Sequence, residues 1–174
     1  MLAFSQKFKP LDSLTVVNFG SSKKTVVETI KGARGVWEVA YSRPQYYVFS
    51  NLKFDDKSKA LFVVKFTRGK AYETDYIITP NRGVSVLRYY YELIEKINGA
   101  YGTPKSGNNF KSPCRDGDEN AINAIKLGLV YYSAYWPAGD NSIIISIDGR
   151  LRIVLAVQDD KLTNGAFENQ SAVN

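Results

Sequence analysis

Hydrophobic and polar residues alternate along much of this chain, and such alternation is the pattern of half-buried β-strands. Strands are predicted where the alternating runs lie between Gly, Pro and polar turn residues. The predicted strands are 36–41, 45–50, 60–66, 71–79, 129–136, 142–147 and 151–157. Asp148-Gly149 between the last two is a strong hairpin signal, which predicts that these strands pair antiparallel.

Segment 21–32 shows helical spacing instead. Three of its apolar residues share one face: Val26, Val27 and Ile30. Ser21 or Ser22 can cap the free amides at its start, and Gly32 suits a left-handed helix end. A short helix that needs tertiary packing is therefore predicted here.

A longer helix is predicted over 84–98, and residues 119–127 are expected to add one or two helical turns. The apolar stripe predicted for the longer helix consists of Leu87, Tyr90, Tyr91, Ile94 and Ile97. Within the run Tyr89-Tyr90-Tyr91, two side chains are expected to face the core and one to face outward.

These elements predict an α+β fold. Its antiparallel sheet should have six or more strands and be curved, with two main helices packed on one face. Each half has a helical segment followed by a strand, a turn of Gly and a basic residue, and another strand, so a helix-plus-meander duplication is an alternative organisation. We expect one domain over 19–161, preceded by segment 1–18 and followed by a polar tail, 162–174. Residues 103–120 are expected to form a long loop within it.

Composition narrows the chemistry. The 174 residues include no histidine and a single cysteine, Cys114, so one chain cannot build a histidine-dependent triad, a His/Cys zinc site or an internal disulfide. There is no phosphate-binding loop or dinucleotide fingerprint. No run of about 18 apolar residues predicts a transmembrane helix. The sequence favours a non-enzymatic role with no cofactor.

The net charge is +6, and its excess lies in residues 1–80, which hold 13 Lys and Arg against 7 Asp and Glu. A solvated basic surface explains this charge. The alternative is binding of an anionic partner, either nucleic acid or membrane headgroups. The residues assigned to that alternative are Lys23, Lys24, Lys53, Lys57, Lys59, Arg68 and Lys70.

One cluster of aromatic and basic residues is the main candidate for partner contact. Such residues on a sheet face are typical of protein hot spots and can also stack bases or sugars. Packing in an ordinary core is the other interpretation. The cluster consists of Trp37, Tyr41, Arg43, Tyr46 and Tyr47.

Two acidic groups have ordinary explanations. Asp116, Asp118 and Asn120 have the alternate spacing of a calcium loop, but the sixth and twelfth positions hold Ala121 and Leu127, so we favour a solvated loop and assign no metal. The second group, Glu73 and Asp75, lies on one face of a predicted strand. Acid–base chemistry is one explanation for this pair, and an exposed sheet edge that carries charges to prevent aggregation explains it equally well. Cys114 beside Arg115 is expected to be inert.

The order of short motifs over residues 19–160 resembles that of small bacterial envelope proteins. More distantly it is similar to small outer-membrane-assembly lipoproteins and to beta-lactamase-inhibitor-like folds. The motifs are turns and caps, so no functional residue carries over, and without a cysteine near the start the resemblance does not imply a lipid anchor. The motifs that carry the resemblance are the helix start Gly20–Val26, the hairpin Phe66–Tyr72, Tyr101-Gly102-Thr103-Pro104, Tyr135-Trp136 and the closing hairpin 141–157.

The resemblance implies that the protein binds other proteins and catalyses nothing. We therefore expect a binding or structural protein of the bacterial envelope or exterior, which contacts a protein partner through an open sheet face or the 103–120 loop. Residues 1–6 resemble the end of a secretory signal peptide, which favours a secreted or periplasmic location over a cytoplasmic one. An anionic-ligand module is the second hypothesis and a carboxylate-based hydrolase the third.

Overall fold

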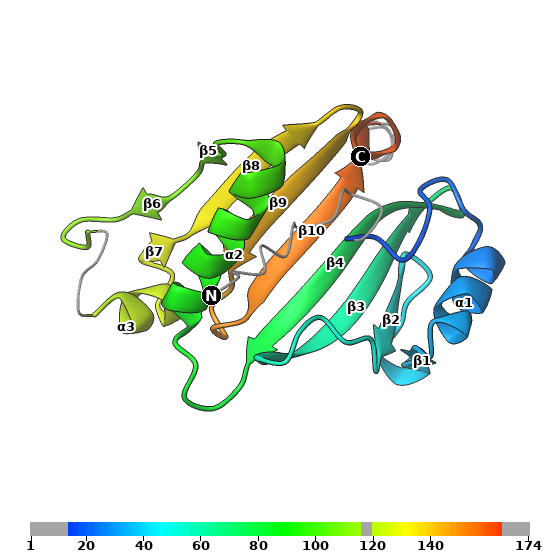
Figure 1. Ribbon diagram of the computed structural model, residues 1–174, viewed down its shortest axis with the longest axis horizontal. Coiled ribbons are helices and arrows are strands. Elements are labelled where there is room, and N and C mark those ends of the chain that lie inside the picture. Colours follow the sequence, from blue (N-terminus) through cyan, green and yellow to red (C-terminus); the bar gives the residue numbers. More distant parts are fainter. Residues whose placement is uncertain (1–13, 116–119, 165–174) are drawn as a thin grey trace, which may run out of the picture.

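The computed structural model describes residues 14–115 and 120–164, and β-strands are the most common regular element among them. Figure 1 shows the strands side by side with helices packed against them. The strands are β1 (Val36–Trp37), β2 (Tyr46–Ser50), β3 (Ser58–Thr67), β4 (Lys70–Pro80), β5 (Lys105–Ser106), β6 (Asn109–Phe110), β7 (Val130–Tyr131), β8 (Ser133–Ala138), β9 (Asn141–Ile147) and β10 (Ile153–Asp159). The helices are α1 (Lys23–Gly32), the 3₁₀ helix η2 (Val39–Tyr41), α2 (Val86–Tyr101) and α3 (Ala121–Lys126), and residues 160–164 after β10 are also helical.

Within the described residues, eight strands form one antiparallel sheet in the order β1-β2-β3-β4-β10-β9-β8-β5, and β6 pairs with β7 separately. The predicted α+β class with an antiparallel sheet is confirmed. Each half of the chain runs from a helix into four strands of this sheet, α1 before β1–β4 and α2 before β5, β8, β9 and β10. The last strands of the halves, β4 and β10, pair in the middle, which agrees with the alternative of a duplicated helix-plus-meander.

The two central hairpins turn differently. Between β3 and β4, Thr67 pairs with Lys70, and both turn residues have positive φ, Arg68 at 48° and Gly69 at 75°. This is the two-residue turn whose twist matches that of the strands. Between β9 and β10 the predicted hairpin is present, but its turn is longer than a two-residue Asp-Gly turn.

The longer turn is organised by Asp148. Its carboxylate accepts hydrogen bonds from the backbone N–H groups of Arg150 and Arg152, at 2.9 Å each. The positive φ falls on Leu151, at 59°. A side chain that satisfies two backbone donors therefore replaces the glycine-centred turn.

Helix α1 follows its prediction at the start and departs from it at the end. The hydroxyl of Ser22 accepts a hydrogen bond from the backbone N–H of Thr25 at 3.2 Å, so Ser22 is the N-cap. Gly32 is the last helical residue, and the left-handed conformation falls on Arg34, whose φ is 65°. Val26 and Ile30 are fully buried.

Helix α2 buries a different stripe from the predicted one. Tyr89 and Tyr90 face the core and Tyr91 is 40% exposed, as expected for the tyrosine run. Leu87 and Ile94 are only partly buried. The buried stripe is Val86, Tyr89, Tyr90, Leu93 and Ile97. Tyr89 and Leu93 face the core, and Leu87 and Tyr91 do not. The helix is apolar over a wide arc, so tertiary packing decides which side of it is buried.

Two predicted strands are interrupted. The prediction for 36–41 was wrong beyond Trp37, where the chain enters η2. There the Trp37 ring N–H donates to the hydroxyl of Ser42 at 2.9 Å, and that hydroxyl donates to the backbone carbonyl of Glu38 at 2.9 Å. These side-chain bonds favour a turn over further strand pairing. The strand predicted over 129–136 is split into β7 and β8.

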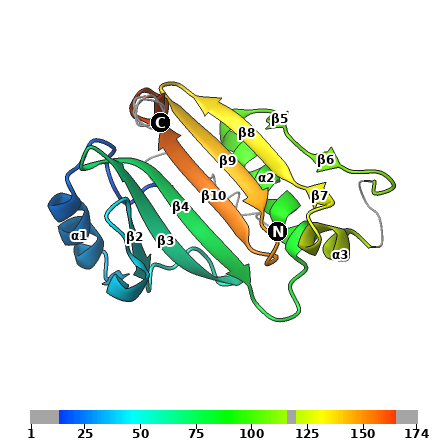
Figure 2. The same ribbon diagram turned by 180° about the vertical axis from the view of Figure 1, so that it is seen from behind.

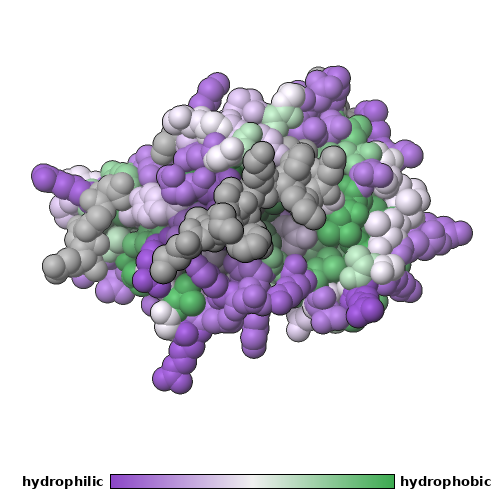
Figure 3. All heavy atoms as spheres, in the orientation of Figure 1, coloured by the Kyte–Doolittle hydropathy of each residue, from purple (hydrophilic) through white to green (hydrophobic). Residues whose placement is uncertain are grey.

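The core joins residues of the strands and of helices α1, α2 and α3 in one hydrophobic cluster. Residues from adjacent strands meet in register rows such as Phe62, Tyr76 and Leu155, all nearly or fully buried. Trp136 is fully buried, and its ring N–H donates to Asn98 and to the carbonyl of Gly102 at the end of α2. On the face shown in Figure 3, the visible hydrophobic residues gather toward the half that carries α1.

Side chains that alternate with the core residues lie on the opposite face, which we call the open face. It is defined by Leu61, Lys65, Glu73, Asp75, Ile77, Val154 and their in-register neighbours. In Figure 2, where α2 lies behind the strands, no coloured helix crosses in front of β4 or β10. Among the described residues, no helix is long and apolar enough to span a membrane.

Candidate functional site

Three charged side chains meet on the open face near the middle of the sheet, and we call them the acid–lysine cluster. Lys65 and Glu73 are directly opposite each other on β3 and β4, and Asp75 lies two residues further along β4. The Lys65 ammonium is 2.6 Å from Glu73 Oε1 and 3.0 Å from Asp75 Oδ2. The two carboxylates therefore converge on one nitrogen.

Asp75 is the unusual member of this cluster. It is only 5% exposed, and its Oδ1 atom has no hydrogen-bond partner among the described residues. Burial raises the pKa of Asp75 to about 7, against the opposing effect of Lys65, and the nearby Glu73 raises it further. Burial opposes the charge of Lys65, but Asp75 and Glu73 outweigh it and raise the pKa of that ammonium. Lys65 thus stays charged, and Asp75 is the group that exchanges a proton near neutral pH.

A second polar group adjoins the cluster on the strands of the other half. Gln158 of β10 is opposite Glu73 on one side and Ser142 of β9 on the other. The Ser142 hydroxyl is 2.7 and 2.8 Å from the two carboxylate oxygens of Asp160, and the Gln158 amide donates to the same carboxylate at 3.2 Å. Tyr135 of β8 reaches Ser142 at 3.1 Å. The polar row therefore crosses the junction between the two halves.

The chemistry open to these groups is limited. A carboxyl with a pKa near 7 has the proton affinity of a general acid or base, but Asp75 is buried and its Oδ2 is bound to Lys65. Ser142 is 1% exposed, and the chain has no histidine to activate it. Among the described residues, no three His, Cys, Asp or Glu side chains are grouped to hold a metal ion.

Apolar side chains flank the cluster on the same face. Leu61, Ile77 and Val154 are direct neighbours across β3, β4 and β10, and each is partly exposed. We call these three residues the apolar band. In the row of Asp75, Val63 and Ala156 are its direct partners on either side, and both are buried. The open face thus presents an apolar strip beside a buried acid–lysine cluster.

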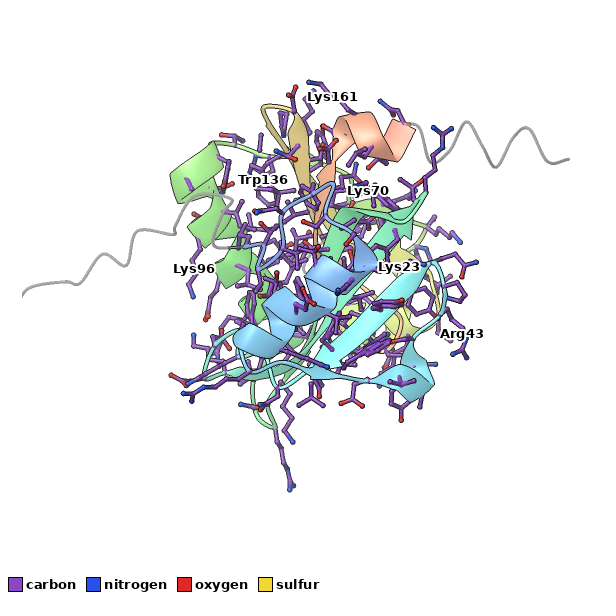
Figure 4. All side chains as sticks on the ribbon, turned by 90° about the vertical axis from the view of Figure 1, so that its right-hand side faces the viewer. Lys23, Arg43, Lys70, Lys96, Trp136 and Lys161 are labelled. Atoms are coloured by element: carbon purple, nitrogen blue, oxygen red, sulfur yellow. The ribbon has the colours of Figure 1, made fainter. Side chains whose placement is uncertain are left out.

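The structure separates the predicted aromatic and basic cluster. The Trp37 and Tyr47 rings pack at 4.9 Å and Tyr47 meets the Phe66 ring at 5.0 Å, so this pair is partly buried against the core. Tyr41 is 67% exposed on η2. The Arg43 guanidinium donates to the carbonyl of Ser42 at 2.7 Å and lies at the outer edge of the molecule (Figure 4).

Tyr46 is the member of that predicted set on the open face, where it is opposite Lys65. The five residues therefore do not form one surface. Their separation follows from the alternation of β2, in which Tyr46 and Tyr47 must point to opposite faces.

The basic residues proposed for an anionic partner fall into two groups. Lys57 and Lys59 lie at the start of β3, whereas Arg68 and Lys70 lie at its other end, roughly 30 Å away at about 3.3 Å per residue. Lys23 belongs to the second group because Ser22 pairs with Lys70, and Figure 4 shows Lys23 and Lys70 on the same side of the molecule.

Several of these cations also have partners of their own. The Lys53 and Lys57 ammonium groups pair with Asp56 and Glu92. Lys23 lies over aromatic rings, 5.7 Å from the ring centre of Tyr47. The sequence therefore grouped residues that the fold distributes over two ends of the sheet.

The calcium-like segment falls mainly outside the described residues, which end at Arg115 and resume at Asn120. The predicted ligands Asp116 and Asp118 thus stay a prediction. Asn120 is at the N-cap of α3, and its side chain makes no capping hydrogen bond. Cys114 is free, partly buried and packed against the core.

A second apolar surface lies beside the predicted 103–120 loop. Leu127 is 72% exposed, Tyr131 is 52% exposed and Leu129 is 36% exposed. The loop is not structureless, because it contains β5, paired with β8, and β6, paired with β7. This surface is the competitor to the open face for partner contact.

The acid–lysine cluster was missed from the sequence, although part of its signal is present there. Glu73 and Asp75 were correctly placed on one strand face, but their interpretation as an exposed charged edge was wrong. β4 is the fourth of eight strands in the sheet, and Asp75 is buried. The register set at the Arg68-Gly69 turn pairs Phe66 with Ala71, and a shift in register between Lys65 and Phe66 then brings Lys65 opposite Glu73.

Comparisons with known proteins leave the family open. The chain matches no protein-family model, no curated protein and no solved structure.

Proposed function

We propose that this protein is a non-enzymatic binding protein that contacts a protein partner through the open face. The observation that carries the proposal is the apolar band, in which Leu61, Ile77 and Val154 stay partly exposed on three neighbouring strands. Antiparallel sheets usually present a polar face to water, so apolar residues in the middle of such a face indicate a surface that is covered by a partner.

The arrangement of the helices supports this use of the sheet. We take both α1 and α2 to pack on the face opposite the open one, because Val26 and Ile30 of α1 belong to the same core cluster as Tyr90 of α2. We also take the sheet to be curved toward the open face. The support is that Val63 and Ala156 are buried there, although Figure 2 shows no coloured helix over their strands.

Capture of a partner by the immobilised full chain tests the proposal. Ile77→Thr and Val154→Thr keep β-branched side chains, and therefore the strands, while making the apolar band polar. We expect the double variant to lose a protein that the wild type captures from an extract of the source cells. Leu127→Thr, on the competing apolar surface, should capture that protein normally.

Circular dichroism must show that both variants are folded. Capture that survives in the double variant but is lost in Leu127→Thr would move the binding site to the surface beside the 103–120 loop and refute the proposal.

We further propose that the protein works in the bacterial envelope or exterior, and the support is the resemblance over residues 19–160. Fractionation of source cells with an antibody against the chain tests the location. Recovery in the cytoplasmic fraction alone would contradict it.

The anionic-ligand hypothesis is weaker as a single-site model because its basic residues lie at two ends of β3.

A further inference from the structure

We propose that Glu73 and Asp75 form a subsite on the open face for an arginine side chain of the protein partner. This inference rests on the proposed function and names the chemistry that the partner brings. It is carried by the geometry of the acid–lysine cluster and by the unpartnered carboxylate oxygen of Asp75.

The charges in the cluster do not balance. When Asp75 and Glu73 are both ionised, two carboxylates face a single ammonium, that of Lys65, in a chain whose net charge is +6. Lys65 contacts Oδ2 of Asp75 and leaves Oδ1 without a donor among the described residues. A buried carboxylate oxygen without a partner carries a cost of a few kcal/mol, which a donor supplied by a ligand removes.

The cross-strand neighbours of Asp75 supply no donor to its Oδ1 atom. Its direct partners on β3 and β10 are Val63 and Ala156, which have no polar side-chain atoms. The charged or titratable groups that act on Asp75 are Lys65 from β3 and Glu73 from its own strand, and a hydrogen bond to Glu73 favours the protonated form of Asp75. When both acids are ionised, Oδ1 therefore has no donor among the described residues.

An arginine guanidinium suits the Glu73 and Asp75 carboxylates better than a lysine ammonium, which is a point charge. The planar guanidinium offers a fork of five N–H donors that can engage two carboxylates at once. The apolar partners of Asp75, Val63 and Ala156, suit the methylene stem of an incoming side chain. Of the three side chains in the cluster, Lys65 is the most exposed at 36%, against 15% for Glu73 and 8% for Asp75. Lys65 is thus the one that can swing out as the guanidinium enters.

A small probe tests the subsite without the partner. The probe is N-acetyl-arginine methylamide, and the readout is the movement of the backbone amide signals of Ala156 and Gln158 in two-dimensional NMR. Lys65→Met removes the resident cation while both carboxylates remain. We expect it to bind the probe roughly tenfold more tightly than the wild type, since the probe no longer competes with Lys65.

Three controls make the result specific. N-acetyl-citrulline methylamide has the same shape without the charge and should leave the signals unmoved. Glu73→Gln added to Lys65→Met should abolish binding of the arginine probe. If Lys65→Met does not fold, Lys65→Gln provides the same test with a polar stem.

Equal binding of the arginine and citrulline probes, or no gain on removal of Lys65, would overturn the subsite. Capture of the partner through the apolar band could still succeed in that case. Conversely, probe binding with no loss of capture in the Ile77→Thr and Val154→Thr double variant would refute the proposed function and leave the subsite standing.

Discussion

The ammonium of Lys65 lies 3.0 Å from the carboxylate of Asp75, and Asp75 is only 5% exposed although it sits on the face of the sheet opposite α2. The pair joins two neighbouring strands of the first half, directly beside β10 of the second half. A charged contact at this junction makes the open face sensitive to pH, to substitution and to whatever binds there.

The first prediction concerns pH. The native pKa of Asp75 is raised to about 7 from an ordinary value of 3.8, so the folded state holds more protons than the unfolded state between these values. The contribution of Asp75 to stability is therefore full below about pH 4 and is lost as pH rises to 7. Asp75→Asn cannot titrate and should lack this loss. Urea unfolding at pH 5 and pH 8 should show the wild type losing stability relative to Asp75→Asn.

A constant difference between wild type and Asp75→Asn across this window would show that Asp75 does not titrate there. A wild type that gains stability relative to the variant on going from pH 5 to pH 8 would show that the pKa is lowered, and would refute the buried acid.

The second prediction compares two lysines. Lys65→Met leaves Glu73 and Asp75 without their cation and should cost about 2 kcal/mol at pH 8, less than a fully buried pair because Lys65 is a third exposed. Lys57→Met breaks a pair with Glu92 in which the side chains are 53% and 36% exposed, against 8% for Asp75, and should cost less than about 1 kcal/mol. Urea unfolding of the two variants measures the difference, and equal costs would contradict the buried cluster.

The third prediction concerns the contact between α2 and β8. The Trp136 ring N–H donates to Asn98 and to the carbonyl of Gly102, and the ring is fully buried. Trp136→Phe keeps an aromatic ring but leaves these acceptors without their donor, and should cost about 2 kcal/mol or more. A loss below about 0.5 kcal/mol in thermal or urea unfolding would be at odds with this anchor.

The sequence predicted local pairing better than it predicted long-range neighbours. Alternating residues and the Arg68-Gly69 turn correctly indicated the β3–β4 hairpin, because the turn and its flanking strands are close in the chain. The burial of Asp75 depends on β10, which supplies Ala156 from far along the sequence. Alternation alone places Asp75 on the face opposite the core, where a charged residue is expected to be exposed, so its burial could not be predicted.

The candidate site was predictable in part for the same reason. Glu73 and Asp75 could be placed on one strand face, but Lys65 is opposite Glu73 only because the register shifts between Lys65 and Phe66. Gln158 and Ser142 join the row only through β10 and β9. The aromatic and basic cluster is spread out in the structure because Trp37 bonds to Ser42 and the chain leaves the strand there. Such a side-chain bond has no periodic signal in the sequence.

The fourth prediction uses two glycines with opposite requirements. Gly69 has a φ of 75° in the β3–β4 turn, so Gly69→Ala places a side chain in the left-handed region and should cost about 1 kcal/mol. Gly99 lies in α2 with open space around an added methyl group, so Gly99→Ala should raise stability by about 0.5 to 1 kcal/mol. Changes of the same sign in urea unfolding would contradict the assigned backbone at one of these positions.

Site-specific photo-crosslinking shows directly whether a protein partner contacts the open face. A diazirine side chain replaces Val154 on the open face in one protein and Leu127 on the competing surface in another, and each is irradiated in source-cell extract. We expect a discrete crosslinked protein from position 154 and no such product from position 127. Adding Ile77→Thr to the protein with the diazirine at position 154 should abolish the product. A product from position 127 together with none from position 154 would show that the partner does not contact the open face.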